Sequence, residues 1–373
     1  MVSSLSDQRV EVHHIRTTEE FKNIQEAWGE LLEKRHSQTA FLTWEWMYTW
    51  WKHYGTEKEL WLITAWKDGK LIGGAPLMLS RVSRFGLRYR ILQSLGKPNT
   101  DESDFITAEE APEEVIQSLV GYIASQNNQW DALELCEFNP ESNTSQIVIN
   151  EISKLNLRTI EKSEPHYQIL LSRPWEEYWK SLSKNTRDSI EKRYKQGVKK
   201  MDLQFQYINA ADVTWQHFET IFAINETARY PEKYGSTKER AFLADMVEAM
   251  NGKGWLEVIF LHMEGKPIAY DYGFNMNGRF EDWRTGYNLN YSTQAAGKIL
   301  LYLLIKHQFE HGYKLFDFLR GAYEYKTQWN PDGRDFKTLI AVKPFHLPAR
   351  LALITLPNLW NWYKRNILKR SPA

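Results

Sequence analysis

Hydrophobic and polar positions along the chain follow two periods, one typical of helices and one of strands. Apolar side chains recur every three or four residues over Phe41–Tyr54, which predicts an amphipathic helix ending at Gly55. Apolar runs at Leu60–Trp66 and Leu71–Leu79 flank an Asp-Gly turn and predict a β-hairpin. Helix-like and strand-like segments continue to alternate, which predicts an α/β fold with mixed sheets.

The same order of landmarks occurs twice. A second hairpin is predicted around Glu264–Ala269, whose sequence parallels Asp68–Gly73 at the first hairpin. Further on, Tyr313–Phe318 parallels Trp130–Leu135. Two matched landmarks in the same order indicate an internal duplication. We therefore expect two modules and a tail, over residues 1–165, 166–345 and 346–373.

Charge and composition narrow the class of protein. The 47 basic residues equal the 47 acidic ones, which disfavours a DNA-binding protein. The single cysteine, Cys136, lies in a strand-like run and is expected to be a buried structural thiol. The longest apolar run, Ile299–Ile305, falls far short of the ~20 residues of a membrane span. With no apolar signal segment at the start, we expect a cytoplasmic protein. No histidine or cysteine pattern predicts a metal site.

A loop of small residues precedes the apolar helix predicted over Ile299–Glu310. The first N–H groups of a helix lack internal partners, and the helix dipole favours an anion there. Small side chains would let a pyrophosphate approach the backbone, and the loop carries one lysine and no acid. The corresponding helix of the first module starts at Glu109–Glu114, whose four carboxylates would repel phosphate. We therefore expect a phosphorylated cofactor in the second module only, held by Ser292, Thr293, Ala295, Ala296, Gly297 and Lys298.

A basic segment separates the two modules. Tyr178–Lys200 carries eight Lys or Arg residues against two acids and predicts one long basic helix. This helix either presents a solvated face or lies near a ligand that carries phosphate.

Several of these runs together resemble a known family. Tyr291–Lys298, Leu315–Gly321 and Tyr325–Trp329 are similar to GNAT acyltransferases of the CelD-like (BioF2-like) group of cellulose and exopolysaccharide biosynthesis. Phe41–Trp46 adds to this resemblance. Such proteins have tandem GNAT-like modules, as the Fem-type transferases do. The resemblance implies acetyl-CoA or another acyl-CoA as co-substrate and a pyrophosphate loop over Gln294–Ile299, in which Ile299 replaces a small residue.

The resemblance also implies roles for individual residues. Tyr325 would protonate the leaving thiolate, although a purely structural tyrosine is an equal alternative. Asp271 and Glu281 lie on predicted central strands, where burial raises a carboxyl pKa and suits a general base. A carboxylate paired with an arginine is the structural alternative. We assign acceptor binding to Asp104, Arg284, Tyr287, Arg320 and Lys326.

Three functions remain open at this stage. The first is an acyl-CoA-dependent N-acyltransferase acting on an amine of a sugar or small metabolite, in an exopolysaccharide or cell-envelope context. The second is a Fem-type transferase using aminoacyl-tRNA, whose basic helix would follow RNA phosphates. The third is a non-catalytic protein of polysaccharide assembly. The tail from Lys343 on is basic and aromatic without an acid, so it could lie on the inner membrane face, pack on the body or bind a partner.

Overall fold

The computed structural model describes residues 9–34, 38–108, 112–228 and 235–366. The chain forms two compact units. The first unit comprises Met1–Ser37, Phe41–Glu164 and Asp335–Ala373, and the second comprises Gln38–Ala40 and Pro165–Arg334. The sequence-based division placed residues up to 345 in the second module. The structure instead assigns the residues from Asp335 on to the first unit.

The sheet of the first unit has the strand order β1-β2-β3-β4-β6-β13. Its strands are β1 (Glu11–Ile15), β2 (Lys58–Lys67), β3 (Lys70–Arg84), β4 (Leu87–Ser94), β6 (Ala132–Phe138) and β13 (Asp332–Val342), and the short β5 (Ile106–Thr107) pairs with β3. Neighbours are antiparallel except β4 and β6, which are parallel. The predicted hairpin is therefore confirmed as β2–β3.

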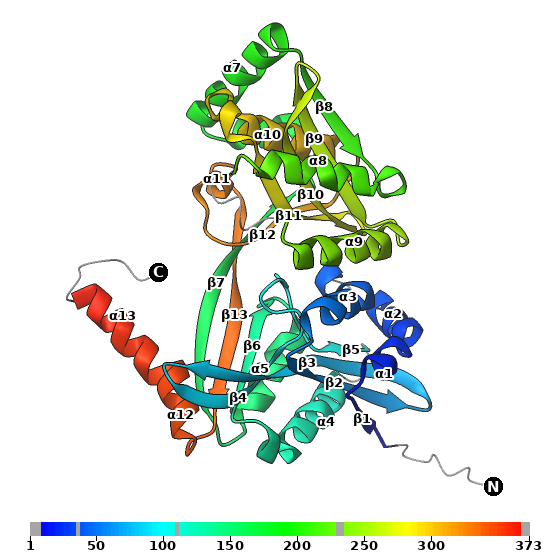
Figure 1. Cartoon of the computed structure of the whole chain (residues 1–373), viewed down its shortest axis with the longest axis vertical. Helices are drawn as coiled ribbons and strands as arrows, with labels where there is room; N and C mark the ends of the chain where they lie inside the picture. The colour runs from blue at the N-terminus through cyan, green and yellow to red at the C-terminus, as the bar shows by residue number, and fades with distance from the viewer. Residues whose placement is uncertain (1–8, 35–37, 109–111, 229–234, 367–373) are drawn as a thin grey trace. The chain divides into compact units, whose positions relative to one another are not determined.

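Helices cover both faces of this sheet (Figure 1). They are α1 (Thr18–Lys22), α2 (Gln25–Glu33), η1 (Ala40–Leu42), α3 (Trp44–Tyr54), α4 (Pro112–Ser125), η2 (Asn127–Gln129), α5 (Asn143–Ser153), α12 (Leu347–Arg350) and η6 (Leu351–Thr355). The last helix, α13 (Leu356–Asn366), follows η6 and extends away from the sheet (Figure 1). Along β6, Leu133 and Leu135 share one core with α4 and α5, whereas Ala132 joins a second core with α12 and η6. Because successive strand residues point to opposite faces, the two helix groups lie on opposite sides.

The sheet of the second unit has the order β7-β12-β11-β10-β9-β8. Its strands are β7 (Arg158–Leu170), of which the residues from Pro165 on belong to this unit, β12 (Leu315–Arg320), β11 (Arg279–Tyr287), β10 (Lys266–Met276), β9 (Leu256–Met263) and β8 (Leu203–Ile208). All neighbours are antiparallel except β11 and β12. This pattern repeats that of the first unit strand for strand and supports the predicted duplication.

The closing strands of the two sheets are exchanged along the chain. β7 follows β6 in sequence but pairs with β12 of the second unit. β13 follows β12 in sequence but pairs with β6 of the first unit. This exchange explains why a boundary drawn along the sequence misassigned residues 335–345.

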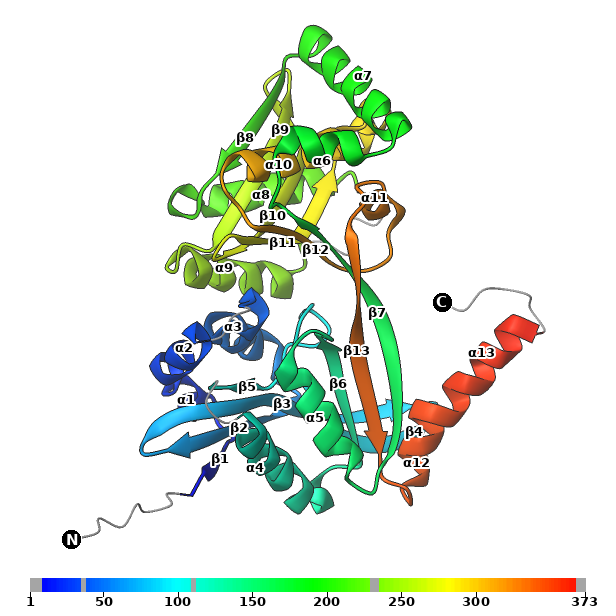
Figure 2. The same cartoon turned by 180° about the vertical axis from the view of Figure 1, so that it is seen from behind.

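The helices of the second unit are α6 (Trp175–Ser181), α7 (Lys184–Lys200), η3 (Ala210–Asp212), α8 (Trp215–Asn225), α9 (Thr237–Asn251), η5 (Leu289–Gln294), α10 (Ala296–Glu310) and α11 (Glu324–Thr327). The helices α6, α7 and α10 contribute to one core with β9 and β10. α8 packs on the other face of the sheet, as the front and rear views show (Figures 1 and 2).

Two predicted helix boundaries are wrong. The single basic helix over Tyr178–Lys200 is broken at Leu182, because Ser183 caps a new helix by accepting a hydrogen bond from the Thr186 N–H at 3.1 Å. The helix predicted from Ile299 begins at Ala296 instead. The prediction for Cys136 is confirmed: the thiol is buried, and burial raises its pKa to about 11.

Candidate active site

A β-bulge in the second unit brings two acids to the same face of the sheet. Along β10 and β11, Tyr272 pairs with Arg284 and Gly273 pairs with Asp282, which leaves Trp283 as an extra residue. A Cβ on Gly273 would lie 2.0 Å from the Glu281 carbonyl oxygen, so only glycine permits this close approach. The extra residue shifts the alternation, so Asp282 lines the same cavity as Asp271.

The two carboxyl groups are buried and share a hydrogen bond. Asp271 is 1% exposed and Asp282 is 6% exposed. Burial raises the pKa of both, and the neighbouring Asp282 charge raises that of Asp271 further. The Lys326 charge counters this rise at Asp282. One proton therefore resides on Asp271 while Asp282 is the more readily ionised partner. Within the described residues, Asp271 Oδ1 and Asp282 Oδ2 have no hydrogen-bond partner.

The start of α10 forms the opposite side of the site. Ala295 has a left-handed backbone at φ 58°, and α10 begins at the next residue. The residues Ala296, Gly297 and Lys298 thus form the first helical turn, where backbone N–H groups lack intrahelical partners. Ile299 is 1% exposed and belongs to the core of the unit, so its bulk does not enter the cavity. The helix start therefore presents small residues to an incoming anion.

The basic helix α7 supports this helix start. The Arg193 guanidinium donates a hydrogen bond to the Thr293 carbonyl at 2.6 Å. Partial burial, together with the Arg193 charge, lowers the pKa of Lys298. Two cations thus lie near one helix N-terminus, an arrangement that attracts phosphate.

Tyr325 approaches the cavity from the short helix α11. Its pKa is raised by burial and by the charges of Asp282 and Asp271, so the hydroxyl keeps its proton near neutral pH. The adjacent Lys326 is 3% exposed, and its ammonium donates hydrogen bonds to the carbonyls of Phe318 at 2.8 Å and Arg320 at 2.6 Å. Lys326 thus fastens α11 to the end of β12 and fixes the place of Tyr325.

These elements enclose a cavity of about 680 Å³ within the second unit. Its lining combines the acid pair, the helix start, an aromatic wall and a few polar groups: Asn225, Ala228, Asp271, Asp282, Thr285, Gly286, Tyr287, Leu289, Ser292, Ala295, Ala296, Gly297, Lys298, Leu301, Tyr325, Gln328 and Trp329. Eight of the residues expected from the sequence are in this lining: Asp271, Tyr287, Ser292, Ala295, Ala296, Gly297, Lys298 and Tyr325.

The structure places Glu281 away from the cavity. Its Oε2 accepts a hydrogen bond from the Ala40 N–H at 3.0 Å, and its Oε1 lies 3.4 Å from an Arg279 nitrogen. Asp282, rather than Glu281, is therefore the second acid beside Asp271 in the cavity. Strict alternation along β11 would have grouped Glu281 with Thr285 and Tyr287, and the bulge reverses that choice. The signal in the sequence was Gly273, which strand patterning alone does not weigh.

Other expected residues also lie outside the lining. Asp104 belongs to the first unit, where its carboxylate accepts a hydrogen bond at 2.6 Å from Ser142, the N-cap of α5. The Arg284 guanidinium stacks 5.0 Å from the centre of the Trp283 ring. Arg320 ends β12 opposite His166.

Three expected residues remain. Lys326 was expected to bind the acceptor, but it lies outside the lining because its ammonium donates hydrogen bonds to backbone carbonyls of β12. Thr293 and Gln294 belong to η5. The Thr293 hydroxyl donates a hydrogen bond to Gln294 Oε1 at 2.7 Å. Within the described ranges, no group of three or more His, Cys, Asp or Glu residues could hold a metal ion. No helix in the same ranges is long and apolar enough to cross a membrane.

Comparisons with known proteins agree with this geometry. Residues 184–327 match the family model described as an acetyltransferase (GNAT) domain. These residues contain the acid pair, the start of α10 and α11. No curated protein sequence matches the chain.

Solved structures show the same fold over 89–92% of the chain. FemX superimposes with a TM-score of 0.62 at 9% identity, covering 92% of this chain and 99% of FemX. The C-terminal domain (DUF2156) of a putative lysylphosphatidylglycerol synthetase from Agrobacterium fabrum gives 0.55 at 11% identity, with 91% and 97% covered. A tandem GNAT protein from the clavulanic acid biosynthesis pathway gives 0.50 at 10% identity, with 89% and 98% covered. The protein thus has a tandem GNAT-type acyltransferase fold.

Proposed function

We propose that this protein transfers an acyl group from acyl-CoA, most simply acetyl-CoA, to an amine in the cavity of the second unit. The observation that carries the proposal is the shared cavity: an anion-attracting helix start, a proton-sharing acid pair and a protonated tyrosine all line it. A phosphorylated acyl donor needs the first feature, and amine acylation needs a proton acceptor and a proton donor.

The residues at the start of α10 fit the pyrophosphate of CoA. The backbone N–H groups of Ala296, Gly297 and Lys298 would contact its oxygens, with Lys298 and Arg193 supplying positive charge. A Cβ on Gly297 would lie 3.1 Å from the Tyr287 ring, so glycine keeps the space between helix and ring open. When bound, acyl-CoA supplies the activated thioester.

The acid pair suits an amine that arrives as an ammonium ion. Asp271 Oδ1 and Asp282 Oδ2 offer acceptor atoms for its N–H groups. Asp282 takes one proton, which leaves the nitrogen lone pair free to form the new bond to the acyl carbon. The C–S bond breaks as the C–N bond forms, and Tyr325 gives its proton to the departing thiolate sulfur. The second N–H proton lost by the acylated nitrogen returns Tyr325 to its protonated form, and release of the proton on Asp282 to solvent restores the pair. Atoms and charges therefore balance within one turnover.

We further propose a sugar amine or another small metabolite as acceptor, in exopolysaccharide or cell-envelope biosynthesis. The support is the resemblance of Tyr291–Lys298 and Tyr325–Trp329 to the CelD-like group. A cavity of about 680 Å³ suits a small acceptor. An amino-sugar panel with acetyl-CoA, read out as released CoA thiol, tests this choice.

The cofactor site can be tested by calorimetric titration with acetyl-CoA. Wild type and two variants, Gly297→Glu and Gly297→Gln, are compared. Glutamate is favourable in a first helical turn, so the fold should tolerate it, but its charge opposes a phosphate at the same place. Glutamine has nearly the same size without the charge.

We expect binding by wild type, a loss of at least about tenfold in affinity with Gly297→Glu, and a smaller loss with Gly297→Gln. Equal losses in both variants would show a steric effect and leave the phosphate assignment without support. Failure of wild type to bind millimolar acetyl-CoA would overturn the proposal. Transfer assays with aminoacyl-tRNA would then test the Fem-type alternative.

A further inference from the structure

Two segments of the first unit are basic and contain no acid, although the chain as a whole has no net charge. The stretch Leu71–Thr100 covers β3 and β4 and includes four arginines, and Lys343–Ala373 covers the C-terminal helices. α12 packs against β4, so the structure brings the two segments together (Figures 1 and 2). Their shared core includes Tyr89, Ile340 and Leu353.

The tip of the β3–β4 hairpin exposes an aromatic ring between arginines. Phe85 is 62% exposed and adopts a left-handed backbone at φ 54°. Asparagine or aspartate would occupy such a turn with less strain, so a bulky apolar residue there is unusual for a soluble surface. The guanidinium of Arg84 lies 5.2 Å from the centre of the Phe85 ring.

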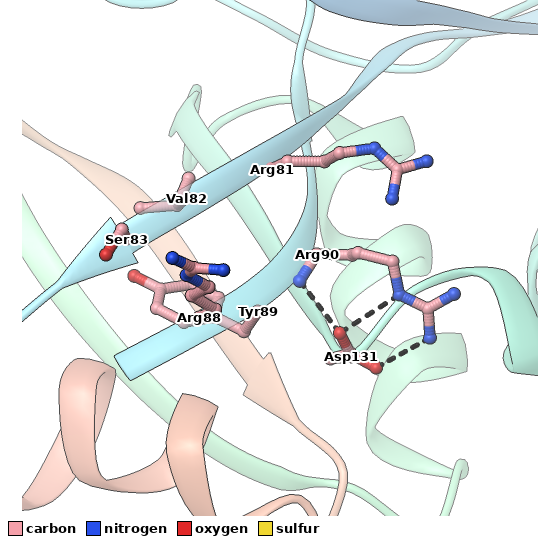
Figure 3. A pocket seen from close by; sticks show the side chains of 7 residues that line it. All are labelled: Arg81, Val82, Ser83, Arg88, Tyr89, Arg90 and Asp131. Carbon is pink, nitrogen blue, oxygen red and sulfur yellow. Dashed lines mark hydrogen bonds and ion pairs between the residues drawn. The ribbon is translucent and has the colours of Figure 1, made fainter. Parts of the chain in front are cut away.

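Beside this tip, three arginines surround a pocket of about 450 Å³ (Figure 3). Arg90 is neutralised by a bidentate contact with Asp131, at 3.1 and 2.9 Å. Arg81 donates a hydrogen bond to Glu59 at 2.7 Å. For Arg88, which is exposed, no ion pair occurs within the part of the chain that the structure describes. The pocket can thus offer Arg88 to an anionic group.

The helix α13 adds a larger apolar surface to the same unit. Leu359, Trp360, Trp362 and Tyr363 are 56%, 54%, 58% and 39% exposed. Positions 359, 360 and 363 share one face of the helix by their spacing. Trp360 and Tyr363 stack at 5.7 Å between ring centres.

We propose that the first unit adsorbs to an anionic membrane surface through α13 and the β3–β4 hairpin tip. Tryptophan and tyrosine favour the boundary between headgroups and acyl chains, and basic side chains favour anionic headgroups. The absence of acids from both segments matches a negatively charged surface.

The test is vesicle co-sedimentation of the full chain. Vesicles of phosphatidylcholine alone are compared with anionic vesicles. The anionic vesicles contain one part phosphatidylglycerol to two parts phosphatidylcholine. The variants are Trp360→Ser with Trp362→Ser, Phe85→Asn, and Arg84→Gln with Arg88→Gln. Two controls leave the surface intact: Lys70→Gln, at the opposite end of β3, and Val198→Ala, an exposed apolar residue of the second unit.

We expect wild type to bind the anionic vesicles at least about tenfold more tightly than phosphatidylcholine vesicles, with weaker binding at high salt. The tryptophan variant should lose at least about tenfold in affinity, and each arginine lost should cost up to about fivefold at low salt. Phe85→Asn should lose a few-fold, and both controls should bind as wild type does. Circular dichroism and thermal unfolding show whether each variant is folded.

Three outcomes would overturn the proposal. The first is that wild type does not sediment with the anionic vesicles. The second is that the tryptophan and arginine variants bind them as tightly as wild type does. A third outcome is concentration-dependent self-association that the tryptophan variant abolishes, without vesicle binding, which would assign α13 to contact with a second copy. None of these results depends on acyl transfer, so the proposed function is tested separately.

Discussion

The two units pair their strands in the same way, yet only one of them holds the cavity described above. The helix between the fourth and fifth strands shows the first difference. In the first unit, the first turn of α4 carries Glu113 and Glu114, whereas in the second unit the first turn of α10 carries Gly297 and Lys298. Glu109 and Glu110, which the sequence analysis also placed at this helix start, lie outside the described residues. The acidic residues at the start of α4 stabilise that helix, whereas the start of α10 is open to an anion.

The strands differ as well. Aligning the two hairpin tips places Ala75 of β3 at the position of Asp271 in β10. Aligning β6 of the first unit with β12 of the second unit places Glu134 of β6 at the position of Asp317 in β12. The first unit thus fills one position with a core alanine, while the second unit buries an acid at both. The proposed chemistry therefore depends on a buried acid at a position where the first unit has a core alanine.

The largest expected effect comes from replacing Asp271 of the second unit by alanine, the residue that the first unit has at the matching position. Asp271→Ala should lower the rate of acyl transfer about 10²–10⁴-fold, because the proton-sharing pair is lost. Release of CoA from acetyl-CoA in the presence of an accepted amine measures this rate. Asp188→Ala, at an exposed acid on α7, is the matched control and should keep wild-type activity. Activity of the Asp271 variant within about threefold of wild type would exclude a role for the pair.

A second comparison concerns the acids at matching positions of β6 and β12. Asp317 is fully buried and accepts hydrogen bonds from Arg279 and Arg334, each at 2.8 Å. Asp317→Asn should destabilise the protein by about 3–5 kcal/mol, since it leaves buried guanidinium charge uncompensated. The partly exposed Glu134 contacts Lys97, so Glu134→Gln should cost about 0–1 kcal/mol. Urea unfolding measures both, and equal costs would refute the distinction.

The acid pair should also make stability depend on pH. The folded-state pKa of Asp271 is raised well above its ordinary 3.8, and that of Asp282 is raised to about 6. Between about pH 4 and pH 6 the folded state binds more protons than the unfolded state. The free energy of unfolding therefore falls as the pH rises through this range. Because Asp271→Ala removes one of the two buried carboxyl groups, its stability should fall less with rising pH than that of wild type. Thermal unfolding at several pH values measures the two slopes, and an equal fall in both proteins would contradict this explanation.

The smallest effect concerns the proton donor. Tyr325→Phe should lower the transfer rate about tenfold, because a thiolate leaves with only modest need of a proton. Tyr323 stacks on Tyr325 with ring centres 6.0 Å apart and is the natural control. Tyr323→Phe should leave the rate unchanged. If both variants lose the same activity, the aromatic stack rather than the Tyr325 hydroxyl is what matters.

Sequence patterns alone predicted the mixed α/β character, the duplication and the contrast between the two helix starts. Hairpin tips, small residues before a helix and charge at a helix start depend on neighbours in sequence, so pattern reasoning captured them. It also identified Asp271 and Tyr325, which the structure places in one cavity.

The partner of Asp271 and the unit to which β13 belongs could be identified only from the three-dimensional pairing of strands. The choice of Asp282 over Glu281 depends on a one-residue bulge that Gly273 permits, and a shift of one residue reverses the face of every side chain beyond it. The exchange of β7 and β13 between the two sheets depends on pairing between segments far apart in the chain. Local periodicity carries no information about such pairing, because each strand would satisfy its alternation equally well in either sheet.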